Sequence, residues 1–438
     1  MTSVEIPEPG AGAASLRAEV VTIGDELLSG AIVDTNSSLI AEKLLGLGIS
    51  VWRMTSVGDE STGIVDLLRE VAGRSHLGIV SGGLGPTEDD RTSQAVAEAF
   101  GRPLALHEPS LRKIRELFER LGFEMTPNNE RQAWIPQGAQ VIPNRMGTAP
   151  GFALEVGGCL LAFLPGVPRE LEAMLDEGLL PLLESRVGLR GRVASRTLKL
   201  FGVTEAKLDQ MVRGALDGLP GTSLASLPRF PENRLRVTVR ARGPKEAMDL
   251  LQEAERRLRE RVGPWVYGVD DEELESVVQG LLRRQGKTLA VAESCTGGLV
   301  AHRLTNIAGS SDVLERAVVA YSLRAKEELL GVPRGLLERE GPVSGEAARA
   351  MARGARERAG TTIGLSVTGI AGPSGGSEET PVGTVFMGLA EGGRSFAQRF
   401  WFRGGRGNVK TMASNVALDW LRRYLLGEDP CAYPGPWR

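Results

Sequence analysis

Short apolar runs alternate with segments of helical periodicity along residues 18–180. The apolar runs predict strands, and segments with apolar positions three and four residues apart predict helices. In chain order these are a strand at Ala18–Thr22, a helix at Asn36–Leu47, a strand at Ile49–Val57, a helix at Ile64–Gly73, a strand at His76–Ser81 and a helix at Arg91–Phe100. This rhythm is typical of a doubly wound parallel sheet with helices on both faces. Thr148–Phe152 and Leu160–Pro168 are expected to be loop-rich segments at strand ends.

Residues 190–268 follow a different pattern, which predicts a small α+β domain. Leu235–Arg242 alternates like a half-exposed strand, and Pro244–Val262 predicts a helix dense in charge. The arginines of this region suggest RNA contact, but a solvated strand face explains them better, because charge runs usually serve solvation. These arginines are Arg229, Arg234, Arg236, Arg240 and Arg242.

The strand–helix alternation resumes over residues 272–426. We therefore expect an α/β fold in which two doubly wound α/β domains, at 18–180 and 272–426, are joined by the small α+β domain. Residues 1–17 are expected to form a flexible tail, and residues 427–438 a second tail. The elements expected in the last domain are helices at Leu274–Gln285, Leu299–Leu304, Ser344–Ala359 and Asn408–Leu426, and strands at Thr288–Ala292, Ala317–Tyr321, Thr362–Thr368 and Gly383–Leu389.

Composition narrows the function classes. Glycine makes up 56 of 438 residues, about 13%, which is nearly twice the usual share and favours loops that approach ligands closely. The net charge of −3 argues against a nucleic-acid-binding protein. The three cysteines and three histidines are scattered, which argues against disulfides and a zinc site. No signal peptide or membrane span is recognisable, so a cytoplasmic protein that binds no membrane is expected.

A glycine-rich loop, Gly82–Asp90, follows a predicted strand and precedes a predicted helix. Backbone N–H groups at such a position can hold phosphate oxygens. The acidic pairs Asp25-Glu26 and Asp89-Asp90 lie at the same carboxyl edge of the sheet, where a divalent cation would bridge them to a phosphate. The alternative is helix capping by Thr87, Asp89 and Asp90.

A second glycine-rich run, Glu293–Gly298, also lies between a strand and a helix. Ser294 there would be a nucleophile, with the N–H groups of Thr296, Gly297 and Gly298 as an oxyanion hole. The base would be Lys326, if burial lowers its pKa, or His302; Tyr321 would relay a proton or fix the lysine. Cys295 is a rival nucleophile, although such a small thiol more often serves packing. For the serine alone, a helix cap is the simpler interpretation.

Long motifs in both halves resemble the CinA family (competence/damage-inducible protein CinA) over roughly residues 18–425. In the N-terminal half they are GDELL (24–28), GGLGPTEDD (82–90), GTAPGF (147–152) and LPGVPRE (164–170). In the C-terminal half they are AESCTGG (292–298), GSS (309–311), AYS..AK (320–326), GPVS (341–344), TGIAGP.GG (368–376) and PVGTV (381–385).

For the N-terminal half, the resemblance implies a fold similar to the MoaB/MogA proteins and an ADP-ribose pyrophosphatase that uses a divalent metal such as Mg²⁺. It implies metal or phosphate ligands at Asp25, Glu26, Asp89 and Asp90. It implies pocket residues at Asn36, Gly83, Gly85, Thr87, Thr148, Gly166 and Glu170. Molybdopterin binding is the weaker alternative, because no other feature of the sequence indicates a pterin.

For the C-terminal half, the resemblance implies a PncC-type amidohydrolase that converts nicotinamide mononucleotide (NMN) to nicotinic acid mononucleotide without a cofactor. It implies that Ser294 is the nucleophile, Lys326 its base and Tyr321 an assisting group. It also implies substrate contacts at Thr296, Gly297, Gly298, Ser311, Thr368, Gly369, Gly372 and Arg406, the last of which could pair with the phosphate.

The chain departs from the family pattern at three places. The family usually has Asn after Tyr-Ser, where this chain has Leu323 and Arg324; it often has Asp where Gly405 stands, and Lys where Thr380 stands. Leu323 and Gly405 could weaken substrate binding.

The expected function is a bifunctional pyridine-nucleotide recycling hydrolase. It would deamidate NMN and cleave ADP-ribose to AMP and ribose 5-phosphate, with these small nucleotides as its partners. The alternatives are a non-catalytic competence-associated protein that binds a recombination protein, and a molybdopterin-binding protein. A homodimer is expected, since two-fold dimers are the commonest assembly.

Overall fold

The computed structural model describes residues 16–187, 192–435 and 437 of the chain. The described residues form two compact units. The first contains the residues up to Ala194 together with Val239–Asp249, and the second contains Ser195–Thr238 together with the residues from Leu250 onward. The expected flexible tail lies outside the described residues except for Leu16 and Arg17, as do residues 190 and 191 at the start of the small domain.

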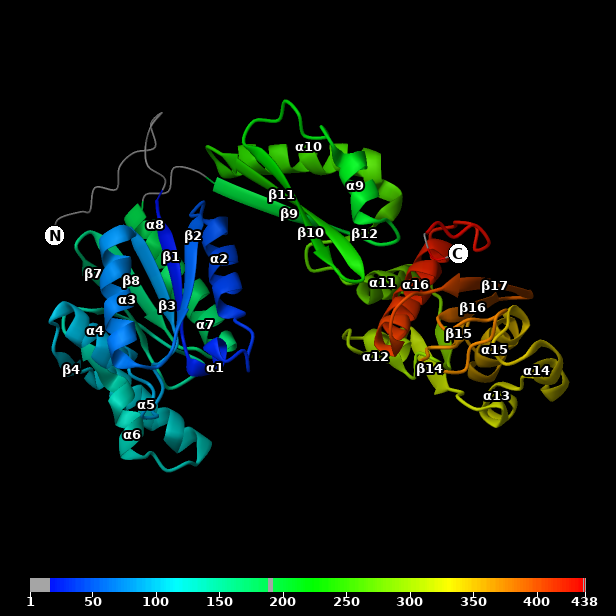
Figure 1. Cartoon of the computed structure of the whole chain (residues 1–438), viewed down its shortest axis with the longest axis horizontal. Coiled ribbons are helices and arrows are strands. Elements are labelled where there is room, and N and C mark those ends of the chain that lie inside the picture. The colour runs from blue at the N-terminus through cyan, green and yellow to red at the C-terminus, as the bar shows by residue number, and fades with distance from the viewer. Residues whose placement is uncertain (1–15, 188–191, 436, 438) are drawn as a thin grey trace. The chain divides into compact units, whose positions relative to one another are not determined.

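The N-terminal domain is built on a six-stranded sheet in the order β2-β1-β3-β8-β7-β6 (Figure 1). Strands β2, β1, β3 and β8 run parallel, whereas β7 and β6 are each antiparallel to the preceding strand in this order. The strands are β1 (Ala18–Ile23), β2 (Val51–Val57), β3 (Leu77–Ser81), β6 (Gln140–Ile142), β7 (Gly151–Val156) and β8 (Cys159–Leu164); β4 (Leu104–Leu106) and β5 (Trp134–Pro136) form a separate antiparallel pair. The expected α/β class is confirmed, but the sheet is mixed rather than wholly parallel.

Helices cover both faces of this sheet because successive strand residues point to opposite sides. On β1, Val20 packs against α2 and α7, whereas Val21 packs against α3 and α4. The helices are α1 (Asp25–Leu28), α2 (Asn36–Gly46), α3 (Ser61–Arg74), α4 (Thr92–Phe100), α5 (Glu108–Leu121), α6 (Pro127–Glu130), α7 (Pro168–Met174) and α8 (Leu180–Val187).

The expectation of loop-rich segments at Thr148–Phe152 and Leu160–Pro168 was wrong for half of their length, because seven of their fourteen residues lie in strands. Gly151 and Phe152 lie in β7, Leu160–Leu164 lie in β8, and the last four residues of β8, Leu161–Leu164, are entirely buried. Gly157 and Gly158 form the tight turn between the two strands, with φ values of +55° and +87°. Glycine reaches this region of φ without strain.

The small domain is a four-stranded sheet in the order β10-β11-β9-β12 with two helices. Its elements are β9 (Arg192–Leu200), α9 (Glu205–Val212), β10 (Thr222–Arg229), β11 (Glu232–Ala241), α10 (Pro244–Val262) and β12 (Val266–Val269). Its charges are largely paired: Arg234 donates to Glu232, and Arg256 and Arg257 of α10 donate to Glu253. Of the five arginines considered for RNA contact, Arg234 is thus held in an ion pair, whereas the other two pairs belong to α10.

The C-terminal domain is a five-stranded sheet in the order β14-β13-β15-β16-β17, parallel over its first three strands and antiparallel over the rest. Helices α11, α12 and α16 cover one face, and α13 to α15 cover the other. The strands are β13 (Leu289–Glu293), β14 (Leu314–Val319), β15 (Ile363–Gly369), β16 (Thr384–Glu391) and β17 (Arg394–Trp401). The helices are α11 (Leu274–Arg284), α12 (Leu299–Thr305), α13 (Leu323–Leu330), α14 (Arg334–Glu340), α15 (Gly345–Ala359) and α16 (Arg406–Leu425).

Buried charges connect the last helix to the segments on either side of it in sequence. Asp419 is fully buried and accepts hydrogen bonds from Arg422, Arg423 and the Tyr433 hydroxyl. Arg423 also donates to the carbonyl of Pro264, in the short turn Gly263–Trp265 before β12. The expected C-terminal tail is therefore packed, at least through Tyr433, against the body of this unit. No helix among the described residues is both long and apolar enough to cross a membrane.

Candidate functional site

Ser294 stands at the carboxyl end of the central strand β13, where it is 7% exposed. It opens onto a pocket of about 160 Å³. Six of the residues expected at the C-terminal site line this pocket: Ser294, Tyr321, Lys326, Thr368, Gly369 and Arg406. The rest of its lining is Cys295, Pro342, Val343 and Ala371. Strands β14, β13 and β15 run parallel, so their carboxyl ends meet at this edge of the sheet.

The amine of Lys326 is directed at Ser294. Its Nζ lies 3.2 Å from Ser294 Oγ and donates a second hydrogen bond of 2.9 Å to the carbonyl of Ala320. The lysine follows Ser322, whose hydroxyl caps the first turn of α13 and so fixes where the helix begins. Burial, at 2% exposed, lowers the pKa of Lys326 below its usual value of 10.5, because a charged amine is poorly solvated there.

Cys295 lies in the same pocket but is not equipped as a nucleophile. Burial raises the pKa of its thiol to about 12, so the thiol stays protonated at neutral pH. Its side chain belongs to the hydrophobic cluster of this domain. The packing interpretation of Cys295 therefore fits the structure.

The backbone of the loop after Ser294 differs from the expected oxyanion hole. Gly297 N–H donates to the Ser294 carbonyl, and Gly298 N–H donates to the buried carboxylate of Glu293. The N–H groups of Cys295 and Thr296 meet no carbonyl or carboxylate among the described residues, although both lie against the Cys295 sulfur. The assignment of Gly297 and Gly298 as donors is thus corrected, because both are used inside the loop.

Glu293 is a functional residue that the sequence analysis missed. Besides Gly298, its carboxylate accepts from the N–H groups of Val300 and Ala301, and so caps α12 from the preceding strand. The side chain is 1% exposed. A glutamate directly before a serine and two glycines, between a strand and a helix, was the available signal for this cap.

Arg406, the first residue of α16, forms the outer wall of the pocket. It donates to the Tyr321 hydroxyl at 3.1 Å and to the Gly372 carbonyl at 2.9 Å. Tyr321 is 62% exposed and its hydroxyl contacts Arg406, whereas no hydrogen bond between the described atoms joins it to Lys326. The structure therefore places Tyr321 beside the arginine rather than in a proton relay. Thr368 donates to the carbonyl of Pro342 and so fixes another wall.

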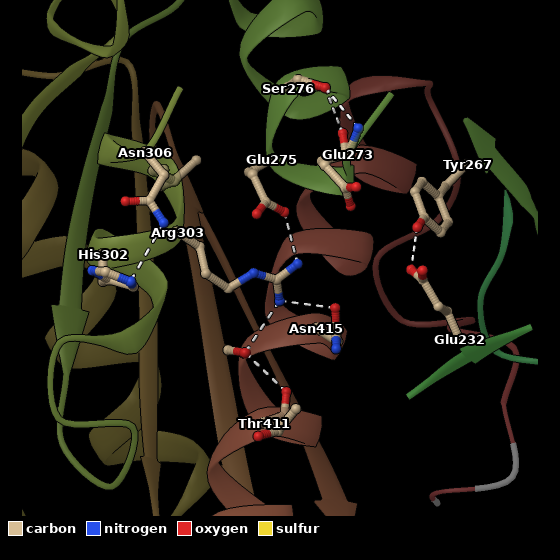
Figure 2. A network of polar contacts seen from close by, with 12 residues as sticks. Glu232, Tyr267, Glu273, Glu275, Ser276, His302, Arg303, Asn306, Thr411 and Asn415 are labelled. Atoms are coloured by element: carbon tan, nitrogen blue, oxygen red, sulfur yellow. Dashed lines mark hydrogen bonds and ion pairs between the residues drawn. The ribbon is translucent and has the colours of Figure 1, made fainter. Parts of the chain in front are cut away.

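Two residues considered for this site lie elsewhere. Ser311 precedes β14 and is exposed at the amino edge of the sheet, opposite Ser294, because the strand between them runs parallel to β13. His302 is on the outer side of α12, where its ring contacts Asn306 (Figure 2). The next residue, Arg303, instead ties α12 to Glu275 of α11 and Asn415 of α16 (Figure 2). His302 is therefore not the base.

The three departures from the family pattern lie around the pocket rather than in it. Leu323 is the first residue of α13 and is 49% exposed, and Gly405 is the N-cap of α16. Thr380 closes a tight turn through Ser377.

In the N-terminal domain, the Gly82–Asp90 loop runs tightly against β1 and α4. Gly82 and Gly83 have φ values of +117° and +66°; a Cβ at Gly82 would collide with the Ile23 carbonyl, and one at Gly83 with the Thr92 side chain. The N–H groups of Gly83, Leu84 and Gly85 meet no hydrogen-bond acceptor in the described part of the chain. Three successive free donors are suited to an anion.

Acidic side chains gather beside this loop, but not as the expected set of four. Asp25 and Asp59 are bonded through each other's backbone N–H groups, at 3.0 and 3.2 Å. Burial raises the pKa of Asp59, and the charges of Asp25, Glu26 and Asp89 raise it further, against a hydrogen bond from Asp25 that lowers it. Asp59 was missed because it follows a strand that carried no recognised motif.

Asp90, by contrast, belongs to the loop itself. Its carboxylate accepts from both the N–H and the hydroxyl of Thr87, at 2.9 and 2.5 Å. This contact closes a turn inside the loop and is not the helix cap considered for Thr87, Asp89 and Asp90, because the N-cap of α4 is Arg91 and no side chain caps that helix. Among the described residues, no group of three or more acidic, histidine or cysteine side chains is arranged to hold a metal by itself.

The other expected residues of the N-terminal pocket are not gathered in one cavity. Asn36 donates to Ser81 and to the Gly166 carbonyl below the loop. Glu170 accepts from Asn144. Thr148 lines a separate hollow of about 550 Å³ beside α5, whereas Gly83, Gly85 and Asp90 line one of about 260 Å³ beside α4.

Comparison with known proteins agrees with this architecture. Three family models match in chain order: a probable molybdopterin binding domain at residues 19–185, a damage-inducible protein CinA KH domain at 195–268 and a CinA C-terminal domain at 271–425. CinA from Thermoplasma acidophilum, a solved structure, is 37% identical, covers 39% of this chain and 97% of its own, and superposes with a TM-score of 0.35.

Curated relatives match along nearly the whole chain. A CinA-like protein of Syntrophus aciditrophicus is 47% identical over 413 residues, which are 94% of this chain and 98% of the relative. A CinA-like protein of Geotalea daltonii is 45% identical over 411 residues, 94% of this chain and 99% of the relative. The family resemblance of the sequence motifs is thereby confirmed, and the chain belongs to the CinA family.

Proposed function

We propose that the C-terminal domain is a serine–lysine amidase that converts NMN to nicotinic acid mononucleotide and ammonia. The observation that carries this proposal is the 3.2 Å contact between Lys326 Nζ and Ser294 Oγ at the floor of a pocket. A lysine is a base only when it is neutral, and burial lowers the pKa of Lys326 in that direction.

In the first half-reaction, Ser294 Oγ attacks the carboxamide carbon while its proton passes to Lys326 Nζ. The Cys295 and Thr296 N–H groups, which meet no carbonyl or carboxylate, would turn from the Cys295 sulfur to donate to the oxygen as negative charge develops on it. The C–N bond then breaks, Lys326 returns the proton to the leaving nitrogen, and ammonia departs. Ala320, whose carbonyl accepts from Lys326, orients the amine throughout.

In the second half-reaction, water attacks the ester formed on Ser294. Lys326 takes the proton of the water and passes it to Ser294 Oγ as the ester bond breaks, which releases the carboxylic acid and restores the enzyme. Arg406 stands at the mouth of the pocket and would pair with the phosphate of the nucleotide.

The test is ammonia release from NMN by the full chain. The wild type should release ammonia, and Ser294→Ala should not. Ser311→Ala is the matched control, because this serine is exposed at the opposite edge of the sheet. No release by the wild type, or equal release by Ser294→Ala, contradicts the proposal and leaves the non-catalytic alternative.

We further propose that the N-terminal domain hydrolyses ADP-ribose to AMP and ribose 5-phosphate with a divalent cation. Support comes from the three free N–H groups of Gly83–Gly85, which suit a phosphate, next to the paired carboxylates of Asp25 and Asp59. Magnesium commonly uses one or two carboxylates and takes its remaining ligands from phosphate and water, so these residues fit the ion without a third protein ligand. When bound there, the cation would neutralise charge on the pyrophosphate.

The test is AMP formation from ADP-ribose with and without added Mg²⁺. Asp25→Asn should remove the metal-dependent reaction. Asp66→Asn, at an exposed position of α3, should leave it unchanged. Equal AMP formation by Asp25→Asn would exclude this role for the acidic pair.

A further inference from the structure

A hollow of about 260 Å³ lies on the side of the Gly82–Asp90 loop that faces α4. The loop contributes Gly83, Gly85 and Asp90 to its wall, so the hollow is continuous with the proposed phosphate cradle. The opposite wall is Arg131, Gln132 and Trp134, from the short helical turn Arg131–Ala133 and strand β5. Pockets for whole drug-sized ligands measure about 300–1,000 Å³. This hollow is therefore of a size for one part of a dinucleotide.

The most informative residue of the hollow is Gln132. It is 8% exposed, and its Oε1 is buried without any hydrogen-bond partner in the described part of the chain. Buried polar atoms are nearly always paired, because an unpaired one has lost water without replacement. Gln132 also lines the hollow, so a ligand bound there can supply the missing donor once the amide turns toward it.

The residues beside Gln132 suit a flat ring. Trp134 presents its indole at 40% exposure, and its position is fixed by pairing with Leu106 across the β4–β5 ladder. Arg131 lines the hollow and makes no ion pair or hydrogen bond through its guanidinium among the described residues. Aromatic and guanidinium planes both stack on nucleic-acid bases.

A carboxamide can distinguish between purines. Gln can pair in two places with adenine, accepting from the N6 amino group and donating to the neighbouring ring nitrogen N7. Guanine offers two acceptors, O6 and N7, on the same edge, and would leave the buried Oε1 without a donor.

We propose that this hollow is the adenine subsite of the N-terminal site, with Gln132 selecting adenine and Trp134 supporting the ring. The proposal rests on the ADP-ribose hydrolysis proposed above and names the end of the substrate that is recognised. The base lies between α4 and the β4–β5 pair, and the pyrophosphate extends over Gly83–Gly85 toward Asp25.

The test measures binding and turnover separately on the full-length protein. Calorimetric titration with AMP, GMP and a simple pterin, 6-hydroxymethylpterin, gives the base preference without any need for catalysis. We expect AMP to bind at least 10-fold more tightly than GMP or the pterin. Gln132→Leu should weaken AMP at least 10-fold and remove the preference over GMP. Gln137→Leu, at an exposed position directly after β5 that does not line the hollow, should change neither.

In turnover, Gln132→Leu should raise KM for ADP-ribose with little change in kcat, because the base is remote from the bond that breaks. If Gln132→Leu fails to fold, Trp134→Ala, a substitution at a half-exposed position, should weaken AMP in the same way. Equal binding of AMP and GMP, tighter binding of the pterin, or unchanged AMP affinity in both variants overturns the subsite.

The two proposals fail separately. If the protein binds AMP, loses this binding in Gln132→Leu, and does not cleave ADP-ribose, the subsite is supported and the hydrolysis is refuted. Cleavage of ADP-ribose with an unchanged KM in Gln132→Leu refutes the subsite and supports the hydrolysis.

Discussion

Replacing Lys326 by methionine tests the proposed amidase chemistry most directly. Methionine has a similar length and keeps the apolar stem, but it has no proton to accept or donate. Lys326 Nζ makes two hydrogen bonds, to Ser294 and to Ala320, and the residue is 2% exposed. The substitution therefore removes the base while the cavity around it stays filled.

The effect on rate should be large and the effect on stability small. Loss of a positioned base lowers kcat by about 10²–10⁴-fold, which corresponds to about 3–5 kcal/mol of activation free energy. The Ala320 carbonyl loses its donor, at a cost of about 1–3 kcal/mol. Removal of a buried amine offsets part of that cost. The expected shift in the free energy of unfolding is thus at most about 2 kcal/mol.

The pH dependence provides a second readout from the same group. Because the pKa of Lys326 in the folded state is below 10.5, the unfolded chain binds more protons between those two values. The free energy of unfolding should therefore gain a contribution from Lys326 as pH rises through that window, and lose it as pH falls below the folded pKa. The deamidation rate should rise through the folded pKa as the amine becomes neutral.

Ammonia release from NMN across a pH series, together with thermal unfolding of each variant, measures both quantities. Lys326→Met should lose the rate at every pH and also the Lys326 contribution to the pH dependence of unfolding. Lys245→Met, at an exposed position on α10, controls for removal of a lysine. The reasoning is refuted if folded Lys326→Met keeps more than a tenth of the wild-type rate.

Three further predictions concern the groups that hold the two sites in place. Glu293→Gln should lower the melting temperature and the amidase rate together, because a neutral amide caps the three N–H groups at the start of α12 less well, by about 1 kcal/mol. In a melting experiment, Glu315→Gln on an exposed part of β14 is the control, and equal melting temperatures of the two variants would contradict the capping role. Gly83→Ala should lower the free energy of unfolding more than Gly122→Ala does. Both glycines have positive φ, but only at Gly83 would the new Cβ collide with a side chain, that of Thr92. Denaturant titration measures the difference, and equal losses of unfolding free energy would mean that only the backbone strain matters. Asp59→Asn should raise the melting temperature at neutral pH, because burial and the neighbouring charges raise the pKa of Asp59 and so favour its neutral form. The same substitution should remove Mg²⁺-dependent AMP formation. A melting temperature below that of the wild type would argue against this electrostatic strain.

The carboxyl edge of each sheet was predictable because strand ends and glycine runs are visible in the sequence. Ser294 and Lys326 are 32 residues apart, yet each follows one of two neighbouring parallel strands, so their meeting followed from the predicted topology and the family motifs. Ser311 was misplaced because a motif match does not say which end of a strand it occupies.

Hydrogen-bond use inside a loop was not predictable. From the sequence, the Gly298 N–H could donate either to an oxyanion or to the Glu293 carboxylate. The Asp90 carboxylate could likewise bind a metal or accept from Thr87. Only the backbone conformation of each loop decides between the two partners. Asp59 and Gln132 belong to no motif, and their importance depends on partners brought together, or left absent, by tertiary packing.

The buried charges around Asp419 bear on how this protein can be divided. The C-terminal family model stops at residue 425, yet Arg423 also bonds to Pro264 on one side in sequence and to Glu428 on the other, and Asp419 depends on Tyr433. A fragment cut at the family boundaries would expose a carboxylate and two guanidinium groups that were folded away from water, with part of their partners removed. A fragment meant to keep these charges paired should therefore begin before Pro264 and end after Tyr433.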